Sequence, residues 1–170
     1  LNHGAYAVDV NYKKGVSLED PNIESFITEN GYRYFPLKKK SHPINRLIHS
    51  EQSKSQELQL TKYMLNQLHI DDEMAMVSMT KGFTIACGTN KVYVRLRGRD
   101  DEHVWDIAPF EMLLRECGCY ATTPDGKGLV YNKEGRVENT KNGILFTCGD
   151  EAFHQEVLRV YNEGYQQFFH

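Results

Sequence analysis

The chain has 170 residues, with 20 Lys or Arg against 23 Asp or Glu, and its formal net charge is −3. This length suffices for one domain with a hydrophobic core. The slight acidic excess argues against a binder of nucleic acid polymers, because such proteins usually carry a basic excess. No apolar run reaches the roughly 18 residues that a membrane-spanning helix needs. We therefore expect neither a nucleic acid polymer nor a membrane as partner.

The chain starts at Leu1 rather than at Met, and no signal-peptide pattern follows, so we expect an internal start. Its four cysteines match no zinc-ligand spacing. Because free Cys is among the most buried residue types, we expect four buried thiols and the cytoplasm or another reducing compartment. These residues are Cys87, Cys117, Cys119 and Cys148.

Hydrophobic periodicity indicates an irregular N-terminal part, followed by helices and strands in alternation. Weak strand patterns cover residues 5–10 and 32–35, and the acidic run over 71–73 is expected in a solvated loop. Such an alternation predicts a layered α/β fold. The pattern predicts a helix over 53–68, buried strands over 74–78 and 91–96, a helix over 106–117, strands over 120–123 and 143–148, and a last helix capped by Asp150.

Asp106 stands where a polar stretch meets the helix predicted over 106–117. One of its carboxylate oxygens can cap that helix. The other can face a site, where hard cations such as Mg²⁺ prefer oxygen ligands. The local pattern alone favours a plain N-cap aspartate over a metal ligand.

Motifs in the right order from about residue 45 to 160 resemble the C-terminal signature of the inositol monophosphatase superfamily, whose members are magnesium-dependent and lithium-sensitive phosphatases. Three segments carry the resemblance: Trp105-Asp106-Ile107-Ala108, Glu116-Cys117-Gly118-Cys119 and Thr122-Thr123-Pro124-Asp125-Gly126. Upstream, Lys81-x-x-x-Ile85-Ala86-x-Gly88 is similar to another superfamily motif.

Within that superfamily, further details are most similar to the 3'(2'),5'-bisphosphate nucleotidases. These details are the Ser-x-x-Lys segment from Ser78 to Lys81, the Tyr-apolar-Arg segment from Tyr93 to Arg95, and the charged stretch over 97–103. A softer similarity is the segment from Ile48 to Ser50, which contains His49.

The resemblance implies a layered αβα sugar-phosphatase-like fold, with a mixed sheet flanked by helices, of which this chain would form the C-terminal half. Residues 1–50 would hold the tail end of the N-terminal sheet region and a connecting loop. Residues 51–170 would form the C-terminal α/β domain.

The resemblance also implies metal-assisted hydrolysis of a small phosphate ester, with Mg²⁺ as the cofactor. Asp106 would be the catalytic metal ligand and would help to orient the leaving group. Ser78 and Lys81 would contact the nucleotide, Lys81 as a point charge for phosphate, and His49 would lie against it. By local pattern alone, Lys81 also fits a surface lysine and His49 a core-edge histidine.

The superfamily's other metal ligands, an acidic cluster and an Asp-Pro-x-Asp-Gly-Thr motif, do not occur in these 170 residues. One carboxylate binds Mg²⁺ only weakly. We therefore expect the chain to be inactive alone and to need the N-terminal half of the fold, as a second chain or an unseen segment. Phe110 and Cys119 stand where the family usually has small residues, which indicates a divergent member.

Three functions remain open. The first is hydrolysis of 3'-phosphoadenosine 5'-phosphate to AMP and phosphate, and the second is hydrolysis of an inositol phosphate or polyphosphate. The third is non-catalytic, a pseudophosphatase subunit or scaffold. A generic α/β domain that matches by chance would have to explain motifs spread over more than half of the chain.

Overall fold

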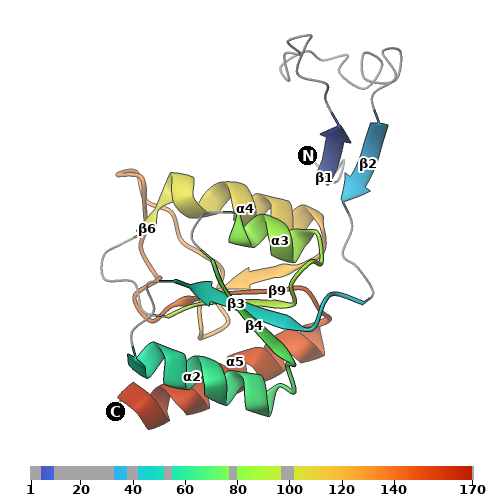
Figure 1. The fold of residues 1–170 in the computed structure, drawn as a ribbon. Helices are drawn as coiled ribbons and strands as arrows, with labels where there is room; N and C mark the ends of the chain where they lie inside the picture. The colour runs from blue at the N-terminus through green and yellow to red at the C-terminus, as the bar shows by residue number, and fades with distance from the viewer. Residues whose placement is uncertain are drawn as a thin grey trace.

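The computed structural model describes residues 5–9, 33–37, 42–51, 55–76, 80–96 and 102–169. Strands β1 (Ala5–Asp9) and β2 (Arg33–Leu37) form an antiparallel pair. The other elements in chain order are β3 (Arg46–Ser50), α2 (Ser55–Gln67), β4 (Asp72–Met76), α3 (Lys81–Ala86), β5 (Val92–Arg95), β6 (Glu102–His103), α4 (Val104–Glu116), β7 (Tyr120–Thr122), β8 (Arg136–Val137), β9 (Ile144–Thr147) and α5 (Glu151–Phe169) (Figure 1).

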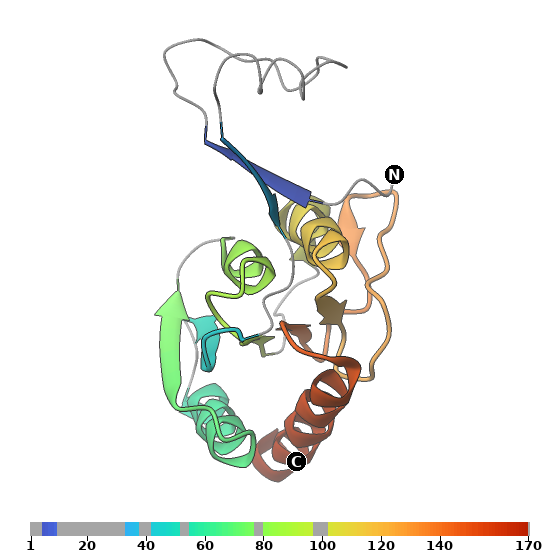
Figure 2. The same cartoon turned by 90° about the vertical axis from the view of Figure 1, so that its right-hand side faces the viewer.

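A mixed five-stranded sheet forms the centre, in the order β4-β3-β5-β9-β7. Strands β4, β3 and β5 run parallel, whereas β9 is antiparallel to its neighbours β5 and β7. Helices α3 and α4 cover one face of this sheet, and α2 and α5 cover the other (Figures 1 and 2). The expectation of a layered α/β fold with a mixed, helix-flanked sheet is confirmed.

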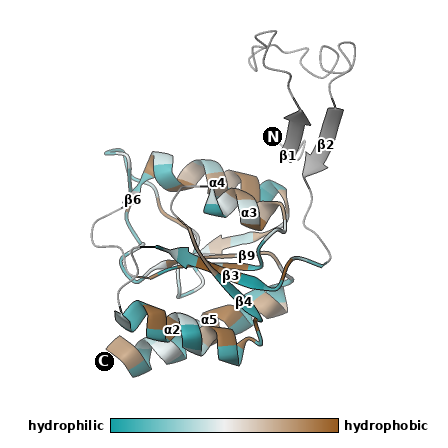
Figure 3. Cartoon of the chain, viewed as in Figure 1, coloured by the Kyte–Doolittle hydropathy of each residue, from teal (hydrophilic) through white to brown (hydrophobic). Residues whose placement is uncertain are grey.

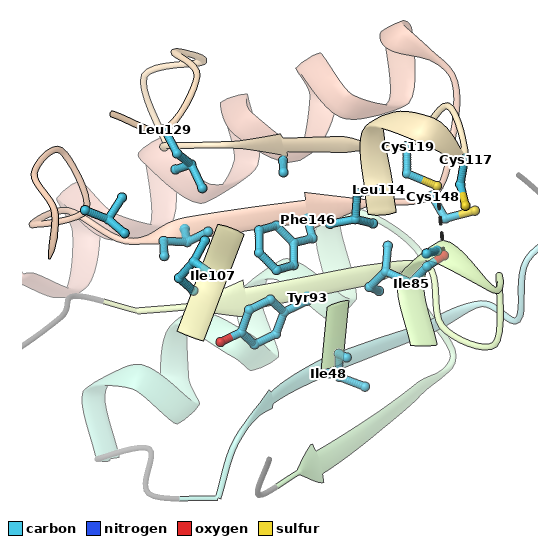
Figure 4. Packing of buried hydrophobic residues seen from close by; sticks show 14 residues of the cluster. Ile48, Ile85, Tyr93, Ile107, Leu114, Cys117, Cys119, Leu129, Phe146 and Cys148 are labelled. Carbon is cyan, nitrogen blue, oxygen red and sulfur yellow. Dashed lines mark hydrogen bonds between the residues drawn. The ribbon is translucent and has the colours of Figure 1, made fainter. Parts of the chain in front are cut away.

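The core is split by the sheet into two clusters of buried side chains. Successive residues of a strand point to opposite faces, so Tyr93 joins the cluster under α3 and α4, while Val92 and Val94 join the cluster over α2 and α5. Figure 4 shows Tyr93 beside Phe146 of β9 in the first cluster, and their ring centroids are 5.2 Å apart. The central strands are buried on both faces, which explains their continuous apolar sequences.

Two glycines let the helices approach each other closely within each layer. A Cβ at Gly82 in α3 would lie 2.4 Å from Cβ of Phe110 in α4, and a Cβ at Gly164 in α5 would lie 2.4 Å from Cδ1 of Leu60 in α2. Phe110 therefore packs onto α3 in the place that Gly82 leaves open. The bulk that distinguishes Phe110 from the family pattern is accommodated by this contact.

Strand β4 departs in part from the sequence-based expectation of a buried strand over 74–78: Met76 is partly buried, and residues 77 and 78 lie outside the described part of the chain. It lies at the edge of the sheet, and residues 72–75 are exposed. The acidic run over 71–73, expected in a loop, lies partly in this strand, because residues 72–76 pair with β3; Asp72 also forms an ion pair with Arg46 of β3 at 2.7 Å. Strand β3 itself was not anticipated, and the domain division at residue 50 stays a prediction.

Helix α4 carries hydrophobic side chains both toward the sheet and on its outer side, alongside four charged residues (Figure 3). Its inner side chains include Ile107 and Leu114, which are 2% and 0% exposed, while Trp105 and Met112 on other sides are 65% and 62% exposed. Phe83 of the neighbouring helix α3 is 43% exposed. Because these three large apolar side chains lie exposed on the outer helices, we define Phe83, Trp105 and Met112 as the uncovered α3–α4 face.

Helix α5, by contrast, has one apolar face, with Val157, Tyr161 and Gly164 buried as predicted. Its start is also as predicted, since the backbone N–H of Phe153 donates to Oδ1 of Asp150 at 2.8 Å. In the described part of the chain, no helix is both long enough and apolar enough to cross a membrane.

Candidate functional site

The parallel part of the sheet defines an edge at which several candidate residues lie. Strands β3, β4 and β5 end there at Ser50, Met76 and Arg95. Helix α3 follows β4 and begins at this edge, and α4 begins there too, because it runs back along the sheet before β7. In open α/β sheets, ligands bind outside the carboxyl ends of the parallel strands. The edge is therefore the candidate site.

Asp106 lies in the first turn of α4 and is half-buried. It is not the N-cap, contrary to our expectation: the helix begins at Val104, and the N-cap is His103, with φ −77° and ψ 143° and no side-chain cap. The reason is that β6 pairs with β8, and the N–H of Val104 still donates to the carbonyl of Gly135 at 2.9 Å. As a first-turn carboxylate, Asp106 is favoured by the helix dipole and is not used in capping.

An aromatic and cationic group that the sequence did not predict flanks Asp106. The rings of His103 and Trp105 stack with centroids 4.2 Å apart, and Nη1 of Arg136 lies 2.9 Å from Nε2 of His103. Since Arg136 can only donate, Nε2 accepts, and His103 carries its proton on Nδ1. That atom is buried without a hydrogen-bond partner among the described residues.

Lys81 is the first residue of α3 and is half-buried. Its ammonium nitrogen lies 5.4 Å from the ring centroid of Tyr93, within the range of a cation–π contact. Tyr93 is 4% exposed and belongs to the core, as its place in an alternating strand predicted. The contact holds the Lys81 ammonium on the same face of the sheet as Asp106.

His49 lies in β3 and is only 6% exposed. Its Nδ1 is 2.9 Å from the carbonyl of Ser50, to which it donates. By strand alternation His49 shares the face of Leu47, which packs under α2 and α5. The structure thus brings Lys81 and Asp106 to one face of the sheet and places His49 on the other. Ser78 lies outside the described residues.

Glu111 is a second carboxylate on α4, and it is 4% exposed. One of its oxygens accepts a hydrogen bond from the hydroxyl of Tyr131, and the other forms an ion pair with Nη2 of Arg115 at 2.8 Å. Burial and the Glu111 carboxylate raise the pKa of Tyr131 above its usual value. Tyr131 and Arg115 thus neutralise or occupy the two oxygens, although Oε1 makes no hydrogen bond to a described residue and its ion-pair partner Arg115 is exposed. We therefore do not take Glu111 as a candidate metal ligand.

Mg²⁺ needs several oxygen ligands in near-octahedral geometry. That part contains no cluster of three or more His, Cys, Asp or Glu residues that could hold a metal ion. Asp106 fits the role of one hard oxygen ligand, because its carboxylate is half-buried and does not cap its helix. A Mg²⁺ ion bound here would need its other protein ligands from elsewhere.

The four cysteines lie away from this site. None of them forms a disulfide, three are buried and Cys87 is half-buried. Figure 4 shows Cys117, Cys119 and Cys148 together at one end of the core cluster under α3 and α4. Burial raises the pKa of Cys117 to about 11, with smaller effects of its neighbouring thiols. A buried thiol with a raised pKa is unreactive.

Comparison with known proteins agrees with this arrangement. Residues 20–159 match the model of the inositol monophosphatase family. No curated protein sequence matches. Among solved structures, the chain is similar to SaIMPase-II with inositol monophosphate bound, with a TM-score of 0.55 and 20% identity over 80% of this chain and 51% of that one. It is also similar to an inositol monophosphatase from Zymomonas mobilis, with a TM-score of 0.57 and 11% identity over 77% and 49%.

At these identities the structural similarity establishes the fold alone, and the chain spans about half of the length of each of the two structures. The family model, however, covers most of the sequence, including Lys81 and Asp106. The chain belongs to the inositol monophosphatase family of phosphatases.

Proposed function

We propose that the chain is the C-terminal half of a Mg²⁺-dependent phosphomonoesterase that hydrolyses 3'-phosphoadenosine 5'-phosphate to AMP and phosphate. The observation that carries the proposal is the position of Asp106 and Lys81, which lie at the start of two helices on one face of the sheet, at its carboxyl edge. The Ser-x-x-Lys segment that ends at Lys81 supports a nucleotide substrate.

In this proposal Asp106 is one of the metal ligands. Bound Mg²⁺ would supply charge neutralisation at the phosphoryl group and an activated water. Asp106 contributes a carboxylate that the first turn of α4 holds in place. Lys81 contributes a positive charge for a phosphate group, and its contact with Tyr93 restrains the direction of the ammonium. We assign Ser78 to the nucleotide as well. His49 lies on the other face of the sheet, one residue before the end of β3. It would contact the ligand only where the ligand extends past the carboxyl end of that strand.

The proposal includes a second structural half that supplies the missing metal ligands. The uncovered α3–α4 face supports this part: Phe83, Trp105 and Met112 expose apolar side chains at 43%, 65% and 62%. An apolar area of this kind marks an interaction surface. The β1–β2 pair lies beyond α3 and α4 (Figures 1 and 2). Two strands alone are marginally stable, so this pair would extend into a larger sheet that covers the helices.

Hydrolysis of an inositol phosphate is the second candidate. Its support is the structural relative that has inositol monophosphate bound, and the geometry of Asp106 serves either substrate. The non-catalytic alternative is a pseudophosphatase subunit or scaffold, and it is supported by the absence of the acidic motifs from these 170 residues. For localisation we propose the cytoplasm or another reducing compartment, since the cysteines are not in disulfides.

The decisive experiment measures phosphate release by the protein purified natively from its own cells, so that any completing segment is retained. The substrates are 3'-phosphoadenosine 5'-phosphate and inositol monophosphate, each with and without Mg²⁺. The test variant is Asp106→Asn. The matched control is Asp150→Asn, which removes the same charge from the start of another helix and keeps a good N-cap.

Mg²⁺-dependent release from the nucleotide that is lost in Asp106→Asn and retained in Asp150→Asn is the expected result. Release from inositol monophosphate alone would overturn the nucleotide assignment. No release from either substrate would refute the proposal of an enzyme and would favour the non-catalytic pseudophosphatase subunit or scaffold. A preparation of the 170-residue chain alone should be inactive, and robust turnover by it would refute the need for a second half.

A further inference from the structure

A cavity of about 220 Å³ lies between the last helix and the ends of strands β7 and β9. At about 30 Å³ per water molecule, it has room for about seven waters. Because α5 forms one wall, the cavity is on the face of the sheet opposite to α3 and α4. Its lining comes from three segments: Thr123, Pro124, Asp125 and Lys127 after β7, Asn139 and Asn142 before β9, and Tyr161, Asn162 and Tyr165 of α5.

Hydrogen bonds between these segments fix the walls of the cavity. The hydroxyl of Tyr161 donates to the carbonyl of Asn142 at 2.6 Å, and Nδ2 of Asn162 donates to the carbonyl of Pro124 at 2.8 Å. Tyr161 is 1% exposed, so its side chain is held by the core. The cavity is therefore preformed, as ligand sites usually are.

Several polar groups remain available to a ligand at the cavity. The side chain of Asn142 is exposed and makes no hydrogen bond to a described residue. Asn162 uses its Nδ2 on two carbonyls, which leaves its Oδ1 as an acceptor. The ammonium of Lys127 has three N–H groups and places one on Oδ2 of Asp125 at 2.7 Å. Donors and acceptors thus occur together around one small space.

The charges at the cavity cancel, because Lys127 and Asp125 are paired with each other. The pair disfavours a ligand with a net charge, which would have to compete with one of the two partners. On the α5 wall, the ring of Tyr165 stacks on Tyr161 on one side and on Phe169 on the other, with centroids 5.9 and 4.8 Å apart. Tyr165 therefore offers its ring edge to the cavity, as an apolar border for one side of a ring-shaped ligand.

We propose that this cavity binds a neutral polyhydroxylated ring of the size of one sugar. Amide groups of Asn142 and Asn162 and the ammonium of Lys127 bond to its hydroxyl groups, and its C–H groups lie against the edge of Tyr165. The site is separate from Asp106 and Lys81, neither of which lines the cavity. It does not depend on the phosphatase proposal.

The test is ligand-observed NMR and calorimetry on the natively purified protein, with methyl glucoside as the neutral sugar probe. Cyclohexanol tests a ring without a set of hydroxyls, glycine betaine a zwitterion, and inorganic phosphate an anion. Saturable binding of methyl glucoside is expected, with weaker or no binding of the other three. Preferential binding of betaine or phosphate, or no binding of methyl glucoside, would overturn the proposal.

Variants test whether the sugar binds in this cavity. Asn142→Ala removes an exposed amide with no structural hydrogen bond, so the protein should fold normally, and it should weaken binding at least about fivefold through the loss of a hydrogen bond. Asn66→Ala, an exposed asparagine on α2, is the matched control and should leave the affinity unchanged. Asp106→Asn should also bind normally. Equal affinity in Asn142→Ala and wild type would place the sugar elsewhere and refute this site.

Discussion

Nδ1 of His154 lies 2.8 Å from the hydroxyl oxygen of Thr147, and this contact ties helix α5 to strand β9. The other ring nitrogen lies 3.1 Å from the hydroxyl of Thr122 on β7. The imidazole also stacks on Tyr120, with centroids 4.8 Å apart, and is 2% exposed. One buried side chain therefore connects three elements, and its charge state matters for the fold.

Burial lowers the pKa of His154 below its ordinary value of 6.5. The unfolded chain therefore binds this proton more readily than the folded chain. The contribution of neutral His154 is complete above about pH 6.5 and is lost as the pH falls through that value toward the lower folded pKa. Urea unfolding at pH 7.5 and pH 5.5 should show lower stability at the acidic pH.

His154→Gln provides the control for this prediction, because glutamine can keep hydrogen bonds to both threonines and does not titrate. The variant should lose less stability than wild type between the two pH values. An equal loss in both proteins would mean that other groups cause the acid sensitivity.

Gly164→Ala should destabilise the protein, although glycine to alanine in a helix usually adds about 0.5–1 kcal/mol of stability. The added methyl would lie 2.4 Å from Cδ1 of Leu60 and 2.7 Å from Cδ1 of Tyr63. Overpacking of this kind costs about 1–3 kcal/mol. Thermal unfolding measures the effect, and Gln166→Ala on the exposed side of α5 should change it little. A stabilised Gly164→Ala variant would contradict the close packing of α2 and α5.

Tyr131→Phe should lower the free energy of unfolding by about 1–3 kcal/mol, because it leaves a buried oxygen of Glu111 without its hydrogen-bond donor. The same substitution in a Glu111→Gln background should cost less, since an uncharged amide is easier to bury. A double-mutant cycle with urea unfolding gives the coupling energy. Additive effects would show that Tyr131 and Glu111 do not interact.

Trp105 is the single tryptophan, so its fluorescence reports on the uncovered α3–α4 face. The 170-residue chain alone should show the red-shifted emission of an indole in water, because Trp105 is 65% exposed. The natively purified protein should show a blue-shifted emission if a second half covers the face. Identical red-shifted spectra would contradict such a partner. A blue shift in the chain alone that grows with concentration would identify a second copy instead.

Elements with strong local signals were predictable from the sequence. The apolar strands β5 and β9 and the capped helix α5 follow from periodicity and from Asp150. Strand β3 was missed, because Arg-Leu-Ile-His-Ser shows neither alternation nor a long apolar run, and its stability comes from its neighbours β4 and β5. Burial was predicted wrongly for residues 74 and 75, which are exposed, since an edge position is not encoded locally.

The candidate site was predictable in part. Asp106 was found from its position at a helix start and from the resemblance to a family, but its place within the helix was not. That depends on the pairing of Glu102 with Val137, which are far apart in the chain. The proximity of Arg136 to His103 and of Tyr131 to Glu111 has the same origin. Such contacts form only when segments far apart in the chain come together, so no local sequence pattern predicts them.

The position of β9 between β5 and β7 has a consequence for the order of assembly during synthesis. In the described part of the chain, β7 pairs only with β9, although β9 is made more than twenty residues later. A nascent chain that ends before Ile144 therefore leaves β7 without a partner and the hydrophobic side chains of α4 without part of their support. Since chains emerge from the N-terminus onward, the five-stranded sheet closes only after β9 has been made, and a ribosome stalled before that point would present an unfinished sheet.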